Sequence, residues 1–263
     1  MNTATIGEIK ERLADGVLSE AEFQVLEQDP RAGVQALLKR ELRARKARDK
    51  ALSRAEEMLE TERRLWARGI QLIAGVDEVG VGPLAGPVLA AAVILPVNAR
   101  ILGVDDSKKL SHKKRESLAI QIREEAIAFA FGHCEPEEID HHNIYQASRL
   151  AMFKAVSNLR KEPQHLLVDA RTVPKTTIGQ TNLIHGDARS HSIAAASILA
   201  KVQRDMLMEK YAIRYPGYGF EKHRGYGTVA HVDALESLGP TPIHRKSFAP
   251  VAHAAMLQRK RKN

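Results

Sequence analysis

The segment Ile73–Pro87 constrains this chain more than any other part of its sequence. An apolar run ends there at Asp77 and Glu78, and glycines and prolines follow at once, which predicts a buried strand that delivers two carboxylates into a tight turn. Adjacent strand residues point to opposite faces, so both acids reach one site only if the strand ends at them and the backbone turns. Gly80 and Gly82 are expected to supply that turn. Taken alone, such an acid pair is more often a charged strand end beside an ordinary loop than a site.

The composition is that of a globular chain with a basic balance. Its 263 residues are 44% hydrophobic and 27% charged, sufficient for a main domain of about 150 to 200 residues and an appendage. We find no apolar signal segment and no run near the ~20 apolar residues of a membrane span. We therefore expect a cytoplasmic protein without a membrane partner. Separately, we expect a monomer. The single cysteine, Cys134, excludes intramolecular disulfides, and the net charge of +8 suggests a nucleic-acid partner.

Residues 1–70 are predicted to form a helical N-terminal extension. Capping boxes begin two of its helices and an Asp-Pro pair begins the third: Thr5 with Glu8, Ser19 with Glu22, and Asp29 with Pro30. The third helix runs into a basic stretch, residues 39–48, which is either a solvated helix face or an arm that contacts phosphates. Residues 71–256 are predicted to form the main domain with a C-terminal helical portion. Residues 257–263 are expected to be a disordered basic tail.

Apolar and β-branched runs predict the strands of the main domain. These runs cover residues 71–78, 88–95, 101–104, 129–134 and 164–169, and another leads from Asn182 to Asp187. The first two are expected to pair antiparallel across the glycine-proline loop. Helices are predicted from Ser111, over 143–159, over 192–211 and over 229–238.

Four acids sit at predicted strand ends: Asp77, Glu78, Asp169 and Asp187. If they cluster, they repel one another and raise their own pKa values unless divalent cations neutralise them. Oxygen ligands suit Mg²⁺ or Mn²⁺, and two such ions ~4 Å apart can clamp a phosphodiester. Periodicity alone leaves open whether the four acids converge.

Two polar segments are candidates for substrate contacts. Ser107, Lys108 and Lys109 offer a hydroxyl and two cations near a predicted helix N-terminus, which is either a phosphate cradle or a plain cap. A glycine-rich, aromatic and basic region over residues 216–228 includes Tyr226. Such a region either stacks on sugars and bases or packs as a surface loop.

From about Leu72 to Pro250, the chain resembles ribonuclease HII, the bacterial type 2 ribonuclease H. The resemblance rests on several motifs in one order: Gly75-Val76-Asp77-Glu78 with Gly80, Gly82 and Pro83-Leu84-Ala85-Gly86-Pro87; Asp106-Ser107-Lys108-Lys109-Leu110; Leu167-Val168-Asp169; Gly186-Asp187-Ala188-Arg189-Ser190 through Arg204-Asp205; and Gly225-Tyr226-Gly227-Thr228. Residues 1–70 resemble the helical extension of longer members.

The resemblance implies an α/β fold, a ribonuclease H-like mixed sheet flanked by helices. It implies hydrolysis of RNA in RNA/DNA hybrids and incision 5′ of a ribonucleotide embedded in duplex DNA, leaving a 3′-hydroxyl and a 5′-phosphate. The four acids then match the catalytic residues that bind two ions, Mn²⁺ or Mg²⁺. Tyr226 matches a tyrosine that stacks on the sugar at the RNA-DNA junction. Ser107, Lys108 and Lys109 fall in a phosphate-contacting stretch.

One residue departs from the family pattern. The family usually has Gly-Arg-Gly after the acid pair, a segment that senses the ribonucleotide 2′-hydroxyl, whereas this chain has Gly80-Val81-Gly82. Valine keeps the backbone donors but removes a five-donor cation, so we expect weaker phosphate clamping with activity retained. An alanine, Ala170, also follows Asp169 where a glycine is common.

Two alternatives accompany this hypothesis. The related ribonuclease HIII is disfavoured because the segment Pro83–Pro87 matches type HII better. A catalytically silent nucleic-acid-binding homologue would use the basic arm and keep the acids for structure. The retained acid quartet argues against it.

Overall fold

The computed structural model describes residues 4–262 and divides the chain into two compact units, with the division between Arg54 and Ala55. Each unit has a hydrophobic core of its own. Among residues 4–262, no helix is long and apolar enough to cross a membrane. The predicted domain boundary at residue 70 stays a prediction.

Three helices form the N-terminal unit: α1 (Ile6–Ala14), α2 (Glu20–Glu27) and α3 (Ala32–Met58) as far as Arg54. Both predicted capping boxes form, since each cap hydroxyl and its Glu partner exchange hydrogen bonds with the backbone. The predicted start of the third helix is too early. The Asp29 carboxylate accepts the backbone N–H of Arg31 at 2.9 Å, and α3 begins only after this turn. Five buried residues form the core: Ile9, Phe23, Leu26, Val34 and Leu38.

The second unit is built on a five-stranded mixed sheet in the order β3-β2-β1-β4-β5. Its strands are β1 (Ile73–Val79), β2 (Val88–Ile94), β3 (Ala128–Cys134), β4 (His165–Asp169) and β5 (Gly179–Leu183). β1 pairs antiparallel with β2 and parallel with β4, so the strand that carries Asp77 and Glu78 lies in the middle of the sheet. Both neighbours pair with β1 as far as Val76, and pairing with β2 alone continues through the two acids.

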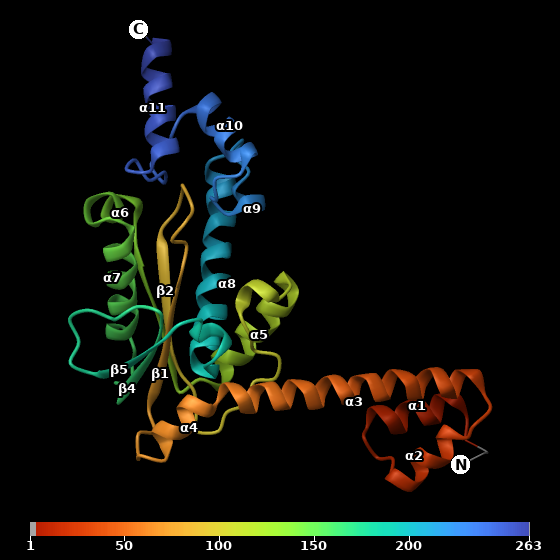
Figure 1. Cartoon of the computed structure of the whole chain (residues 1–263). Helices are drawn as coiled ribbons and strands as arrows, with labels where there is room; N and C mark the ends of the chain where they lie inside the picture. The colour runs from red at the N-terminus through yellow and green to blue at the C-terminus, as the bar shows by residue number, and fades with distance from the viewer. Residues whose placement is uncertain (1–3, 263) are drawn as a thin grey trace. The chain divides into compact units, whose positions relative to one another are not determined.

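Helices cover both faces of this sheet (Figure 1). The long helix α8 (His191–Arg214) packs on one face and α7 (Ile144–Ser157) on the other. Gly75 of β1 allows the close approach of α8, because a Cβ there would lie 2.0 Å from the carbonyl carbon of Ser192. Further helices complete this unit: α4 (Glu60–Trp66), α5 (His112–Glu125), α6 (Pro136–His142), α9 (Phe220–His223), α10 (Val229–Leu238) and α11 (Ala249–Lys262).

Most predicted elements are confirmed, and two strand predictions are wrong. Residues 101–104 form no strand, because the N–H of Ile101 donates to Nε2 of His191 on α8 at 3.2 Å instead of joining a ladder. The strand before Asp187 ends early at Leu183. His185 then takes a left-handed φ of 55° and turns the chain, so Asp187 lies in the 3-10 turn η2 (Gly186–Ala188).

The C-terminal tail is helical as far as it is described, contrary to the predicted disorder. Helix α11 continues to Lys262. Side chains from Gln258 and Arg261 donate to the carbonyl of Glu236 at 3.0 and 3.1 Å, near the end of α10. These contacts satisfy carbonyls that a helix end leaves open, and they hold the tail against α10. Asn263 lies outside the described residues.

Candidate functional site

The acids converge because of the register between β1 and β4. These parallel strands pair through Val76 and Val168, and Asp77 and Asp169 are the next residue of each strand. Because carboxyl ends of parallel strands meet at one edge, both side chains emerge together. β1 continues through Val79 along β2, so the strand does not stop at the acid pair as predicted. Its edge towards β4 is nevertheless open from Asp77 onwards.

A cavity of about 280 Å³ lies at this open edge. Its lining includes most of the predicted site residues, namely Asp77, Glu78, Gly80, Val81, Gly82, Ser107, Lys108, Asp169 and Tyr226. Lys109 and Asp187 are absent from the lining. Lys109 Nζ instead lies 3.8 Å from Asp105 Oδ1, and its predicted contact with substrate stays a prediction.

Asp77 is the most deeply buried of the four acids. It is 6% exposed and faces the α8 side of the sheet, where its own carboxylate accepts the Glu78 N–H at 2.8 Å. Burial raises its pKa well above the usual range, and the Glu78 and Asp169 carboxylates raise it further. An ionised Asp77 is therefore costly unless a cation stands beside it.

Glu78 is held by a cation that the sequence prediction missed. Arg171 Nε lies 3.4 Å from Glu78 Oε1, while Glu78 Oε2 is buried and has no hydrogen-bond partner among residues 4–262. Burial raises the pKa of Glu78, and the charge of Arg171 opposes that shift only in part. One buried carboxylate oxygen of this site residue thus has no hydrogen bond within the described part of the chain, which is unusual for a buried polar atom.

Asp169 and Asp187 are joined through the turn η2. The N–H of Gly186 donates to Asp169 Oδ1 at 2.6 Å. A Cβ on Gly186 would lie 2.7 Å from Cδ1 of Ile193 and 3.2 Å from that oxygen, so a larger residue here would have to displace the Ile193 side chain. Burial, followed by the Asp106 and Asp169 carboxylates, raises the pKa of Asp187. The turn therefore places a fourth carboxylate within electrostatic reach of the strand-end acids.

Two buried arginines hold the glycine turn from beneath. Arg245 donates to the carbonyls of Gly80 (2.6 Å), Val81 (2.9 Å) and Gly86 (3.0 Å). Arg204 of α8 donates to the carbonyls of Ala85, Pro87 and Arg224 at 3.0–3.1 Å. Burial lowers the pKa of Arg245 to about 9, and the charge of Arg204 contributes. Because both guanidinium groups donate hydrogen bonds to backbone carbonyls of the turn, they hold its backbone in place beside the acids.

Tyr226 lies against the outer side of this turn. A Cβ on Gly82 would be 3.7 Å from Tyr226 Cε1, and the tyrosine is 43% exposed. Gly225 must be glycine, because its φ is 85° and a Cβ would approach the Ala85 carbonyl oxygen to 2.5 Å. The N–H of Leu84 also donates to the Gly225 carbonyl at 2.8 Å. The backbone beside Tyr226 is thus fixed, and the ring lines the cavity while remaining accessible for stacking.

Ser107 and Lys108 close the opposite wall from the 3-10 turn η1 (Ser107–Lys109). Ser107 Oγ and Ser197 Oγ are 3.0 Å apart, and Arg115 Nη1 donates to the Ser107 carbonyl at 3.0 Å. Lys108 Nζ, on a side chain that is 84% exposed, lies 3.9 Å from Asp187 Oδ2. The wall therefore presents an anchored hydroxyl and an exposed cation.

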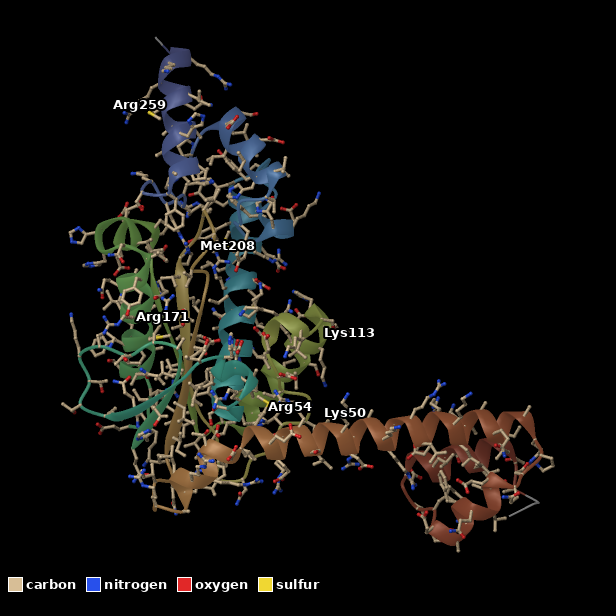
Figure 2. The ribbon with its side chains drawn as sticks, in the orientation of Figure 1. Lys50, Arg54, Lys113, Arg171, Met208 and Arg259 are labelled. Atoms are coloured by element: carbon tan, nitrogen blue, oxygen red, sulfur yellow. The ribbon has the colours of Figure 1, made fainter. Side chains whose placement is uncertain are left out.

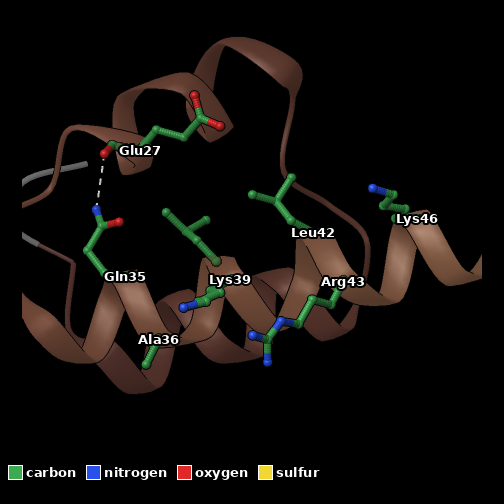
Figure 3. Close-up of a pocket in the computed structure, with 8 residues that line it drawn as sticks. Glu27, Gln35, Ala36, Lys39, Leu42, Arg43 and Lys46 are labelled. Atoms are coloured by element: carbon green, nitrogen blue, oxygen red, sulfur yellow. Dashed lines mark hydrogen bonds between the residues drawn. The ribbon is translucent and has the colours of Figure 1, made fainter.

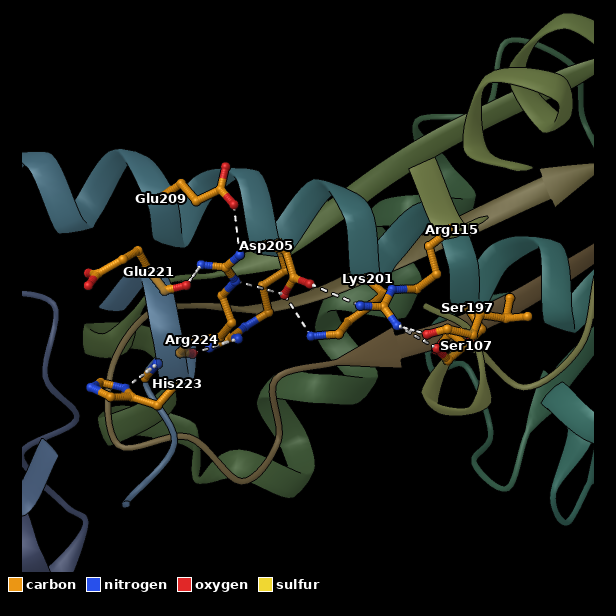
Figure 4. Close-up of polar contacts among 12 residues, drawn as sticks. Ser107, Arg115, Ser197, Lys201, Asp205, Glu209, Glu221, His223 and Arg224 are labelled. Atoms are coloured by element: carbon orange, nitrogen blue, oxygen red, sulfur yellow. Dashed lines mark hydrogen bonds and ion pairs between the residues drawn. The ribbon is translucent and has the colours of Figure 1, made fainter. Parts of the chain in front are cut away.

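A network of charges on α8 supports this wall (Figure 4). Asp205 is buried and accepts from Lys201 Nζ at 2.6 Å, with nitrogens of Arg224 and Arg115 at 3.8 and 3.9 Å. Lys201 itself lines the cavity. Asp205 is thus surrounded by cations, in contrast to the strand-end acids.

The four carboxylates supply the oxygen donors that divalent cations prefer, although they are not arranged as a complete coordination shell. Among residues 4–262, no group of three or more His, Cys, Asp or Glu side chains is arranged to hold a metal ion. The fit instead rests on the unsatisfied Glu78 Oε2 and on carboxyl pKa values raised by burial and mutual repulsion. Oxygen donors of this kind suit hard cations. Small side-chain movements would have to complete the coordination.

Sequence reasoning identified Lys108 but missed four other basic residues of the site. Arg171 and Lys201 line the cavity, and Arg204 and Arg245 brace its turn. Arg171 had one available signal, because it follows a predicted site acid by two residues. Arg245 had none, since its carbonyl partners are more than 150 residues away in the chain.

A second cavity, of about 640 Å³, lies in the N-terminal unit (Figure 3). It is lined by Glu27 of α2 and by residues of α3, including Lys39, Leu42, Arg43 and Lys46. Three cations at spacings of four and three share one face of a helix. Glu27 is the only acid in this lining, so the larger cavity lacks the carboxylate chemistry of the smaller one.

Comparisons with known proteins agree with this geometry. The family model described as Ribonuclease HII matches residues 74–251, and the Ribonuclease HII N-terminal domain matches residues 5–66. Proteins named Ribonuclease HII from Bacillus velezensis and Bacillus subtilis (strain 168) are 52% and 51% identical, each covering 95% of this chain and 98% of its own length. The solved ribonuclease H2 of Pyrococcus horikoshii is 28% identical with a TM-score of 0.62, covering 73% of this chain and 99% of its own. The sheet and its helices therefore form a ribonuclease H-like fold.

Proposed function

Because the chain belongs to the ribonuclease HII family, and is thus an endoribonuclease of the ribonuclease H class, we propose that its open sheet edge is the active site. The proposed reaction is hydrolysis of RNA in RNA/DNA hybrids and incision 5′ of ribonucleotides embedded in duplex DNA, leaving a 3′-hydroxyl and a 5′-phosphate. The observation that carries this proposal is the register of Val76 with Val168, which delivers Asp77 and Asp169 to one edge beside Glu78. The protein acts in this proposal as a cytoplasmic monomer.

Asp77, Glu78, Asp169 and Asp187 are the proposed ligands of two divalent cations, Mg²⁺ or Mn²⁺. Such ions, when bound, supply a polarised water for attack and neutralise charge on the leaving oxygen. A divalent cation beside Asp77 and Asp187 would oppose the burial that raises their pKa values, because a neighbouring positive charge favours the ionised carboxylate. Glu78 Oε2 needs no displacement of an existing hydrogen bond to become a ligand.

The remaining residues bind and orient the substrate. The backbone N–H groups of the Gly80–Gly82 turn are the proposed donors to the ribonucleotide 2′-hydroxyl, since the turn's carbonyls at Gly80 and Val81 are already bound by Arg245. Tyr226 stacks on the sugar at the junction. Ser107, Lys108 and Lys109 contact phosphates from the other wall. Together these contacts read the sugar and hold the backbone without reading a base.

The test is cleavage of a DNA duplex that contains one ribonucleotide. We expect incision 5′ of the ribonucleotide in Mg²⁺ or Mn²⁺, no incision in EDTA, and a loss of at least 10³-fold in rate for Asp77→Asn because a ligand is removed. Asp233→Asn, on α10, is the matched control. Cutting in EDTA, or undiminished cutting by Asp77→Asn, would contradict the proposed mechanism. Binding without cutting would instead support the silent homologue.

A further inference from the structure

Arg171 lines the same cavity as the glycine turn and is oriented by contacts with α7 (Figure 2). Its Nη1 donates to Ser148 Oγ, and its guanidinium carbon lies 5.4 Å from the ring centroid of Tyr145. Stacking on an aromatic face together with a fixed donor contact restrains a side chain that otherwise has many rotamers. The guanidinium is thus held in place before any ligand arrives.

The turn itself offers no cation at this position. Val81 is half-buried and packs against the hydrophobic cluster on the α7 side of the sheet. Arg245 lies beneath the turn, but carbonyls occupy its guanidinium. Arg171 is therefore the cation that the α7 side presents to the cavity, whereas Lys108 and Lys201 lie on the other side.

The donors of Arg171 are only partly used. Its contact with Glu78 is 3.4 Å long, and no hydrogen bond within residues 4–262 uses Nη2. The side chain is 22% exposed. A guanidinium with free donors matches a phosphate better than it matches a single distant carboxylate oxygen.

We propose that Arg171 is a substrate-binding residue that contacts a backbone phosphate beside the ribonucleotide, supplying from the loop after β4 the guanidinium that the Gly80-Val81-Gly82 turn lacks. This inference rests on the proposed nucleic-acid substrate. A purely structural role, the neutralisation of Glu78, would change the stability of the fold but would leave the number of phosphate contacts unchanged.

The salt dependence of binding separates these two roles. The probe is a fluorescein-labelled duplex with one ribonucleotide, bound in EDTA so that no cleavage occurs. Loss of one phosphate contact flattens the plot of log affinity against log salt by about one unit and weakens binding about tenfold at low salt. We expect this for Arg171→Met but not for Arg160→Met, which removes a charge from a different cavity of the same unit. Arg171→Gln tests the same loss if the methionine variant does not fold.

Rescue completes the experiment. Val81→Arg in the Arg171→Met background is expected to restore the salt slope and affinity to within about threefold of the parent chain, because one guanidinium replaces another. An unchanged slope in both Arg171→Met and Arg171→Gln, or a loss that Val81→Arg does not restore, would overturn the inference. Cleavage by the parent chain in Mg²⁺ is measured separately, and its absence would overturn the proposed function without altering these binding differences.

Discussion

At the scale of single residues, the buried Asp77 destabilises the fold that carries it. Burial raises the pKa of Asp77 well above its unfolded value, so the metal-free chain loses stability as the pH rises from the unfolded pKa, about 3.9, through the folded one. Asp77→Asn removes that charge. We expect the variant to be more stable than the parent by about 1 kcal/mol at pH 7 without metal, with a flatter dependence on pH.

Urea unfolding in EDTA at several pH values measures this effect. Asp205→Asn is the opposite control, because its carboxylate is bound by Lys201 and lies near Arg115 and Arg224. That variant leaves cations unpaired and is expected to lose about 3 kcal/mol. Equal destabilisation by both substitutions would refute the argument.

The glycines of the turn differ in what they require. Gly80 has a φ of +87°, and a Cβ there would lie 2.3 Å from Arg204 Nε and 2.9 Å from the Pro87 carbonyl oxygen. Gly80→Ala should therefore cost about 3 kcal/mol or more. Gly82 has no such strain, since the nearest atom to a Cβ added there would be Tyr226 Cε1, at 3.7 Å. Gly82→Ala should stay within about 0.5 kcal/mol of the parent in thermal unfolding, while its methyl group narrows the gap to Tyr226 and lowers kcat/KM about tenfold. A stable Gly80→Ala would show that the turn can adjust.

At the scale of elements, the sequence predicts that acids follow apolar strands, but it does not predict which residues support them. Asp77 and Asp169 were recognisable because an apolar run followed by an acid is a local pattern. The pairing of β1 with β4, and hence the convergence, is set by contacts about 90 residues apart in the chain. Asp187 was placed on a strand because its apolar run is similar, although the left-handed His185 ends that pattern. Ala170 is likewise left-handed, with φ 50°, where the resemblance expects glycine.

The turn between β1 and β2 depends on Arg245 more than on its own sequence. Arg245→Met would leave the carbonyls of Gly80, Val81 and Gly86 without these donors. We expect a loss of about 3–5 kcal/mol in the free energy of unfolding. Arg245→Lys keeps the charge but not the three-way contact, and should be intermediate. Arg160→Met, on the surface, should change stability by less than about 0.5 kcal/mol. Urea unfolding of the three variants measures the order of their stabilities. An unchanged free energy of unfolding in Arg245→Met would mean that water replaces the guanidinium.

At the scale of the whole molecule, the second cavity, in the N-terminal unit, is compatible with both predictions for the basic stretch of α3: an arm that contacts phosphates or a solvated helix face. Lys39, Arg43 and Lys46 line it from one face of α3. Their contact with phosphates would steepen the salt dependence of substrate binding, whereas a merely solvated face would not. Removing residues 1–54 leaves the second unit with its own cores. The slope of this shortened chain therefore distinguishes an arm from a solvated helix.

Where the shortened chain begins decides whether it folds, because α4 belongs to the core of the second unit. Glu62 of α4 is fully buried and accepts from Ser190 Oγ (2.7 Å) and the Ser192 N–H (3.0 Å), at the start of α8. A chain that begins at residue 55 keeps this contact and buried Met58 and Leu65. A chain that begins at residue 71 loses all of them. We expect the longer chain to unfold within a few degrees of the temperature at which the second unit unfolds in the parent chain, and to cleave. The shorter one should lose more than about 5 kcal/mol, from two buried apolar side chains and a helix cap. Calorimetry measures the unfolding temperatures of both chains. Equal Tm values would place the boundary of the second folding unit at residue 70 instead of residue 54.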